Sequence, residues 1–287
     1  MSINSVNGVL EDETNMLLPR LITILVGLPL LVMCIHWGGI PFVLLIAGII
    51  LLGLREFYRM AIQGGYDAQS FLGTLAGVLI LGCMLWSGSH AGVHKENIII
   101  SICIAGLFIV FFTRELFSKS LRQSLLRVSI TFFGIFYVVW TLGHLCLLRE
   151  LRPLGREYTY FLFFIIWTVD FMAYVAGKKF GRFRLNSKVS PGKTIEGTMG
   201  GIISGVLIGV FLQPIIFPDM PIMNIAVMSL CIGIAAQFSD LSESVIKRSF
   251  GVKDSSDLLP GHGGILDRFD SFIFTAPLLY YYLLLQG

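Results

Sequence analysis

The chain has 287 residues with a mean hydropathy of +0.80, and 55% of its residues are hydrophobic. Charged residues make up 14% of the chain, against roughly 25% in an ordinary soluble domain. The apolar residues form long blocks, and the 21 Lys and Arg residues lie mainly in short segments between them. The net charge of +3 therefore gives no indication of a nucleic-acid-binding surface, and the composition excludes an ordinary soluble domain in favour of a membrane protein.

A transmembrane helix needs roughly 20 mostly apolar residues, or about 17 at the lower limit. The sequence contains nine such segments, which predicts an all-α polytopic membrane protein with about nine transmembrane helices. The segments are Leu21–Ile35, Ile40–Leu54, Phe71–Trp86, Ile98–Phe112, Val128–Leu148, Tyr158–Ala176, Met199–Phe217, Ile222–Gln237 and Ser271–Leu285. Closely spaced glycines in the seventh segment, such as Gly201 and Gly205, favour close helix packing in lipid.

The distribution of Lys and Arg predicts the orientation, because these residues are enriched in cytoplasmic loops. If the N-terminus is cytoplasmic, four of the 21 basic residues fall on the opposite side: Lys95, Arg149, Arg152 and Arg156. We therefore expect an N-terminal cytoplasmic tail at 1–19, N-terminal transmembrane helices at 20–157 and a C-terminal transmembrane region at 158–287. The two most charged loops, 177–198 and 238–270, would both face the cytoplasm.

The segment from Asp240 to Asp270 is unusually rich in charge for so apolar a chain. Its acidic residues are Asp240, Glu243, Asp254, Asp257, Asp267 and Asp270. Acids at a membrane border are costly unless they are paired or bound to a cation. Helical spacing places Asp240, Ser244 and Lys247 on one face, and it brings Asp267 and Asp270 together at the start of the last helix. Acids at a helix N-terminus are favourable in their own right, so helix capping is the alternative role for the last two.

Between these helices lies Pro260-Gly261-His262-Gly263-Gly264, a turn with few side chains. Its backbone N–H groups could approach a phosphate closely. The flanking carboxylates suit Mg²⁺, which is typically held by one or two carboxylates plus substrate phosphates. Nearby basic residues would neutralise charge on a transferred phosphoryl group. These residues favour phosphoryl or nucleotidyl transfer, with an ion-coupled transporter or a structural role as alternatives.

The stretch from Ser244 to Asp270 resembles the signature of the phosphatidate cytidylyltransferases, or CDP-diacylglycerol synthases. Its parts are Ser244-Val-Ile-Lys247-Arg248, Lys253-Asp254 with Ser256, and Leu259-Pro-Gly-His-Gly-Gly-Ile-Leu-Asp267-Arg268-Phe-Asp270. The many-span layout is also similar, whereas residues 1–150 match only in general character. The resemblance implies an enzyme of phospholipid biosynthesis that condenses CTP with phosphatidic acid to CDP-diacylglycerol and pyrophosphate. It further implies Mg²⁺ and a second, monovalent cation (K⁺) as cofactors.

The resemblance also implies roles for individual residues, and it makes 158–287 the catalytic region. The implied catalytic set is Asp240, Asp267, Lys247 and Asp270, of which Asp240, Asp267 and Asp270 would be metal ligands. The implied substrate-binding set is Asp170, Ser190, Lys193, Thr194, Ser244, Arg248, Lys253, Asp254, His262, Gly263, Gly264 and Arg268. Because a lipid phosphate is already ionised at neutral pH, we expect His262 to bind phosphate or order the loop, with a general acid as the alternative.

The loop 177–198 contains Gly192-Lys193-Thr194, which looks like the end of a P-loop. However, Ser187 stands where that motif needs its first glycine, and no strand is expected before it. The stretch instead resembles the Ser-Pro-Lys-Lys-Thr-x-Glu-Gly segment of the same family, in which Gly192 replaces a basic residue. That change removes one expected phosphate contact and leaves Lys193 and Thr194 available.

Two acidic residues lie within or beside other predicted spans. Asp170 is inside the sixth, and an ionisable residue there is a functional candidate. It shares a helical face with Ala173 and Tyr174, so we expect it in the substrate cavity, with a hydrogen bond to a neighbouring helix as the alternative. The pair Arg55-Glu56, at the end of the second span, is interpreted as an interfacial ion pair.

The sequence thus predicts a membrane-embedded cytidylyltransferase acting on CTP and phosphatidic acid in the lipid bilayer. The alternatives are a nucleotidyltransferase for another lipid phosphate and an ion-coupled transporter. No nucleic acid partner is expected, and the family resemblance implies a homodimer. We expect the protein in the inner (plasma) membrane of a bacterium, with its active site facing the cytoplasm.

Overall fold

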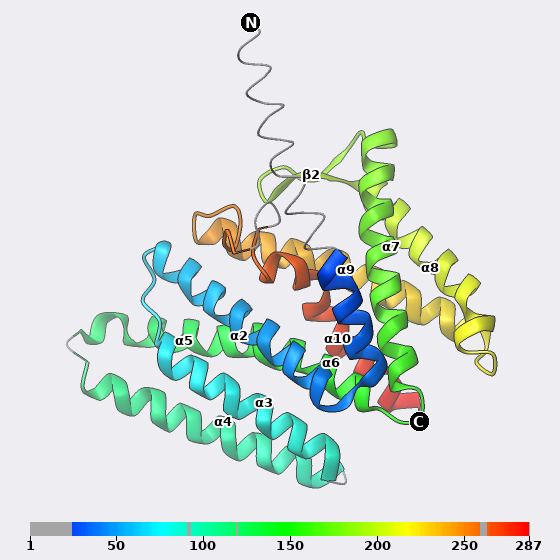
Figure 1. Ribbon diagram of the computed structural model, residues 1–287. Helices are drawn as coiled ribbons and strands as arrows, with labels where there is room; N and C mark the ends of the chain where they lie inside the picture. The colour runs from blue at the N-terminus through cyan, green and yellow to red at the C-terminus, as the bar shows by residue number, and fades with distance from the viewer. Residues whose placement is uncertain (1–24, 91–92, 119, 259–262, 287) are drawn as a thin grey trace, which may run out of the picture.

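The computed structural model describes residues 25–90, 93–118, 120–258 and 263–286, and most of them are helical (Figure 1). A first helix spans Leu25–Trp37. It is followed by α2 (Gly39–Gln63), α3 (Ser70–His90), α4 (Val93–Leu116), η1 (Leu121–Gln123), α5 (Ser124–Gly134), the π-helical η2 (Ile135–Trp140), α6 (Thr141–Glu150), α7 (Gly155–Phe180), β1 (Arg184–Asn186), β2 (Ser190–Thr194), α8 (Ile195–Ile216), α9 (Ile222–Ser249) and α10 (Leu266–Gln286).

Six helices of the described chain are long and apolar enough to cross a membrane. They are Gly39–Gln63, Ile98–Leu116, Leu121–Glu150, Gly155–Phe180, Ile195–Ile216 and Ile222–Ser249. The helices Leu25–Trp37 and Ser70–Trp86 are apolar but shorter, and α10 begins with the charged residues Asp267, Arg268 and Asp270. The all-α membrane fold is therefore confirmed, whereas the number of nine spans and the cytoplasmic N-terminus stay predictions.

Glycines let α8 pack directly against the backbone of α7. A Cβ atom added at Gly201 would lie 2.6 Å from the carbonyl oxygen of Val169, and one added at Gly197 would lie 2.7 Å from that of Ala173. Neither position can accept a side chain unless the helices move apart. The predicted close packing of this glycine-rich segment is thus confirmed, and it fixes Asp170 on α7 beside the start of α8.

Arg149 and Glu150 cap the turn between the helix Leu25–Trp37 and α2. Arg149 Nε donates to the carbonyl oxygen of Ile35 at 2.6 Å, and the amide of Gly39 donates to Glu150 Oε1 at 3.1 Å. A cation at a helix C-terminus and a carboxylate at a helix N-terminus each match the helix dipole. Arg149, one of the four exceptions to the predicted distribution of Lys and Arg, thus has a structural role at this turn.

A short β-hairpin occupies part of the segment 177–198, where a loop was expected, and the expectation that no strand precedes Ser187 is wrong because β1 ends at Asn186. β1 pairs antiparallel with β2, with Arg184 opposite Thr194 and Asn186 opposite Ser190. Asn186 Oδ1 closes the turn by accepting from the amides of Lys188 and Val189, at 3.1 and 3.3 Å. Figure 1 shows the hairpin near the end of α7, on the same side of the molecule as the segment after α9. The two charged loops thus lie at one end of the helices.

Candidate functional site

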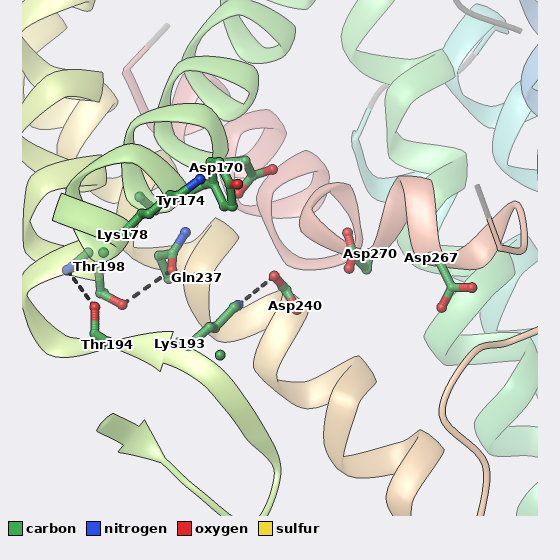
Figure 2. Close-up of a pocket in the computed structure, with 14 residues that line it drawn as sticks. Asp170, Tyr174, Lys178, Lys193, Thr194, Thr198, Gln237, Asp240, Asp267 and Asp270 are labelled. Carbon is green, nitrogen blue, oxygen red and sulfur yellow. Dashed lines mark hydrogen bonds and ion pairs between the residues drawn. The ribbon is translucent and has the colours of Figure 1, made fainter. Parts of the chain in front are cut away.

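A cavity of about 440 Å³ lies where α7, β2, α8, α9 and α10 meet (Figure 2). Of the residues predicted for the site, it is lined by Asp170, Lys193, Thr194, Asp240, Asp267 and Asp270. These residues come from four elements that are far apart in the sequence. The fold therefore brings the hairpin segment, the intramembrane acid and the C-terminal motif to one place.

An ion pair closes the hairpin onto α9 at the edge of this cavity. Lys193 Nζ lies 2.5 Å from Asp240 Oδ2, and the two side chains are 20% and 26% exposed. Figure 2 shows the lysine reaching from β2 to the aspartate. The pair compensates one of the acids in the cavity, and the Lys193 Nζ atom is buried at this contact although both side chains are partly exposed.

Asp170 and Asp270 are both oriented by Ser271 of α10. Ser271 Oγ donates to Asp170 Oδ2 at 3.3 Å, and the Ser271 amide lies 2.6 Å from Asp270 Oδ1. Asp170 therefore lines this cavity and also makes the interhelical hydrogen bond that was the alternative, while its role in binding substrate stays a prediction. Its neighbours Ala173 and Tyr174 line the same cavity.

Asp267 is held more tightly than the other acids. Its carboxylate accepts from Lys247 Nζ at 2.7 Å, from the Ser255 amide at 3.0 Å and from the Gly264 amide at 2.8 Å. Figure 2 shows Asp267 set apart from Asp240, with Asp270 between them. In this arrangement Asp267 orders the segment before α10 while it lines one edge of the cavity.

Lys247 connects Asp267 to a second, fully buried acid. It forms ion pairs with Asp267 and with Glu243, whose side chain is 0% exposed. A buried charge is costly unless an opposite charge compensates it, so this lysine serves both acids at once. Glu243 was not predicted as a site residue. Its i,i+4 spacing to Lys247 does, however, favour an ion pair between the two side chains on one face of a helix.

The carboxylates are suitable ligands for a hard cation, but they are spread along the cavity. No group of three His, Cys, Asp or Glu side chains among the described residues converges closely enough to form a metal site unaided. Mg²⁺ usually takes only one or two carboxylates together with substrate phosphates. The assignment of Asp240, Asp267 and Asp270 as metal ligands stays a prediction.

The other predicted residues that the structure describes do not line this cavity. Arg248 donates to the carbonyl oxygens of Val189 and Val252, at 3.3 and 2.8 Å, and so ties the hairpin turn to the end of α9. Lys253 and Asp254 line a separate cavity of about 530 Å³ beside α2. The remaining residues are Ser190 at the start of β2, Ser244 on α9, Gly263 and Gly264 before α10, Arg268 on α10, and His262, which lies outside the described residues.

Several residues of the site were not predicted from the sequence. Lys178, Thr198 and Gln237 also line the cavity, and Thr198 Oγ1 donates to Gln237 Oε1 at 3.4 Å. Thr198 and Gln237 could have been identified as candidates from the sequence, because each is a polar residue at the edge of an apolar segment. The interpretation of Glu56 as part of an interfacial pair with Arg55 is wrong, because Glu56 is 4% exposed and accepts hydrogen bonds from the segment before α10.

Comparison with known proteins relates nearly the whole chain to one family. Residues 18–286 match the model of the cytidylyltransferase family. A phosphatidate cytidylyltransferase of Synechocystis sp. is 33% identical, with 93% of this chain and 96% of the relative covered. Proteins of the same name from Staphylococcus epidermidis and Bacillus subtilis are 34% and 31% identical, covering 91% and 86% of this chain and 95% and 90% of those relatives.

Proposed function

The chain belongs to the cytidylyltransferase family, and on that premise we propose that it converts CTP and phosphatidic acid to CDP-diacylglycerol and pyrophosphate. The observation that carries the proposal is the convergence of Lys193, Asp240 and Asp270 on one cavity between apolar helices. A soluble nucleotide and a membrane lipid can meet at such a place. The transporter alternative is not favoured, since the relatives are named as transferases.

In the proposed reaction, a phosphate oxygen of phosphatidic acid attacks the α-phosphorus of CTP. The bond from that phosphorus to the bridging oxygen of the β-phosphate breaks, and pyrophosphate leaves with the electron pair. The lipid phosphate is already ionised at neutral pH, so the chain need not supply a general base. Lys178 and Lys193 line the cavity and would stabilise the negative charge that grows on the leaving group.

We further propose that Asp240, Asp267 and Asp270 hold Mg²⁺ when CTP binds, and that a monovalent cation, K⁺, accompanies it. Oxygen ligands at the edge of one cavity support this assignment, because Mg²⁺ prefers carboxylate and phosphate oxygens. The bound ion would neutralise charge on the triphosphate. Within the chain itself, Lys193 and Lys247 already compensate Asp240 and Asp267.

The proposed setting is the inner (plasma) membrane of a bacterium, with about nine spans, a cytoplasmic N-terminus and the cavity open to the cytoplasm. The bacterial origin of the relatives supports this setting. So does the concentration of Lys and Arg in the loops that meet at the cavity, because cytoplasmic loops carry this bias. A homodimer is proposed on the family resemblance.

The substrate assignment is tested with protein purified in detergent and reconstituted in lipid nanodiscs. Pyrophosphate release is measured with Mg²⁺ and CTP in the presence of phosphatidic acid, of a polyprenyl phosphate, or of phosphatidylglycerol, which lacks a phosphate monoester. We expect release with phosphatidic acid and background release with the other two. Release with the polyprenyl phosphate alone would replace the substrate assignment, and no release with any phosphate monoester would refute the enzyme.

A further inference from the structure

Glu56 lies near the end of α2, in the N-terminal half of the chain, yet its side chain reaches the C-terminal motif. It is 4% exposed and forms no ion pair with any described residue. A buried carboxylate without a cation is stable only when hydrogen bonds replace its lost hydration. The hydrogen-bond donors that contact the Glu56 carboxylate therefore indicate which part of the structure this residue stabilises.

Both carboxylate oxygens of Glu56 are saturated by the segment that leads into α10. Oε1 accepts from Ser256 Oγ at 2.6 Å and from the Ile265 amide at 3.0 Å. Oε2 accepts from Ser255 Oγ at 3.2 Å and from the Leu266 amide at 2.8 Å. One side chain of α2 thus holds two points of the chain that lie about ten residues apart.

The amides of Ile265 and Leu266 stand at the N-terminus of α10, where helix geometry leaves the first N–H groups without partners. Glu56 supplies those partners from another helix, and its negative charge suits the positive end of the helix dipole. The same first turn of α10 carries Asp267, and the next turn begins with Asp270. The contact therefore sets where both acids stand at the cavity.

A second link runs from Glu56 to Asp267 through Ser255. The Ser255 hydroxyl lies 3.2 Å from Glu56 Oε2 and 2.9 Å from Asp267 Oδ2, so its single proton can serve either carboxylate. Glu56 and Ser255 also fill the space beside Gly264. A Cβ atom added at Gly264 would lie 1.9 Å from Ser255 Oγ and 2.7 Å from Glu56 Oε2. The need for a glycine at position 264 thus follows from the close approach of Glu56 and Ser255.

We infer that Glu56 is a positioning residue for cytidylyl transfer, which holds the start of α10 so that Asp267 and Asp270 keep their places at the cavity. The inference rests on the proposed function. It also assigns a task to the N-terminal helices, since α2 supplies the anchor for a motif that lies entirely in the C-terminal region.

The test is Glu56→Gln, which keeps the size of the side chain but replaces one acceptor oxygen with an NH₂ group that faces a backbone N–H. Two quantities are measured: kcat with saturating CTP and phosphatidic acid, and hydrogen–deuterium exchange of peptides that contain Ile265 and Leu266. Small displacements of reacting groups can cost on the order of a hundredfold in rate, so we expect kcat to fall at least about tenfold. Exchange at the two amides should become faster.

A matched control is Glu115→Gln, which alters another buried carboxylate. Glu115 is 2% exposed and bonds Arg127 with an Nη2–Oε2 distance of 2.6 Å, away from the described cavities. This variant should lose thermal stability while it keeps kcat and the exchange of Ile265 and Leu266. Equal losses of kcat in the two variants would reduce Glu56 to a stability residue and overturn the inference.

Should Glu56→Gln fail to fold, Ser256→Ala takes its place, because it removes one of the four donors and leaves the carboxylate intact. We expect an intermediate loss of kcat with faster exchange at Ile265. Unchanged kcat and exchange in an active, folded Ser256→Ala protein would contradict the inference. If the unsubstituted protein forms no CDP-lipid, the proposed function fails, whereas the exchange measurement still tests whether Glu56 holds α10.

Discussion

Lys193 on β2 and Asp240 on α9 form an ion pair with an Nζ–Oδ2 distance of 2.5 Å, and this contact joins the two charged loops of the chain. The sequence predicts each residue for the site separately, one for substrate and one for metal. Their pairing means that the charge of Asp240 is compensated before a nucleotide enters. A bound triphosphate and its cation would take over these partners, the phosphates binding the lysine and the cation binding the aspartate.

Replacement of Lys193 by Met should weaken CTP binding and slow transfer. Asp240 would lose its cation, and the incoming phosphates would lose a positive charge in the cavity. We expect the KM for CTP to rise and kcat/KM to fall at least about tenfold, since a charge-assisted contact contributes roughly 1.5–3 kcal/mol. Lys188→Met, in the turn of the same hairpin but outside the cavity lining, is the control and should behave like the unsubstituted protein. If both variants had the same KM and kcat, the proposed role of Lys193 in binding CTP would be wrong.

Asp267→Asn should abolish turnover and leave the overall helical fold intact, with a change confined to the segment before α10. The amide cannot accept hydrogen bonds at both ends, so it cannot serve Lys247, Ser255 and Gly264 together. We expect a loss of activity of at least about a hundredfold, because both a proposed metal ligand and the order of the segment before α10 are lost. Helix content and thermal melting in detergent report the fold. Near-normal rates in this variant would show that the role assigned to Asp267 is wrong.

The buried pair of Glu243 and Lys247 gives a prediction that separates stability from activity. Lys247→Met leaves the carboxylate of Glu243 buried without its cation, and breaking such a pair costs about 3–5 kcal/mol. Adding Glu243→Gln removes that uncompensated charge, so the double variant should recover most of the stability. It should remain inactive, because Asp267 still lacks Lys247. The test compares denaturation midpoints with turnover; a double variant as unstable as Lys247→Met would contradict the explanation.

Gly201→Ala should loosen the contact between α7 and α8. The added methyl group would lie 2.6 Å from the carbonyl oxygen of Val169, which is backbone and cannot rotate away. Overpacking of this kind costs about 1–3 kcal/mol, and activity should also fall because Asp170 stands on α7 and Lys193 stands on β2, which leads directly into α8. Gly82→Ala is the control, since no atom lies within 4 Å of its added Cβ. The two variants are compared by thermal melting and by turnover.

The main features of the fold could be predicted from the sequence because long apolar segments are a local signal. The C-terminal motif and the Ser190–Thr194 segment were likewise recognisable, and Asp170, Lys193, Asp240 and Asp270 do line one cavity. The hairpin was not predicted, because strands of three and five residues carry too little periodicity to be distinguished from a loop.

The role of Glu56 could not be predicted, because its partners lie about two hundred residues away in the sequence. A lone Arg-Glu pair at the end of a span has an adequate local explanation in the membrane interface. Only the packing of α2 beside the start of α10 shows that this carboxylate is buried and directed at the motif. The engagement of Asp267 by Ser255 and Gly264 depends in the same way on the tertiary fold.

The central claim, transfer of the cytidylyl group from CTP to phosphatidic acid, is tested most directly by following two labels. The protein in phosphatidic acid nanodiscs is given Mg²⁺ and CTP labelled with ³²P at either the α- or the γ-phosphorus, and the products are partitioned between chloroform and water. We predict that the α-label enters the chloroform phase as CDP-diacylglycerol, while the γ-label stays in water as pyrophosphate. A γ-label in the lipid would mean phosphoryl transfer, and no label in the lipid from either CTP would contradict the account.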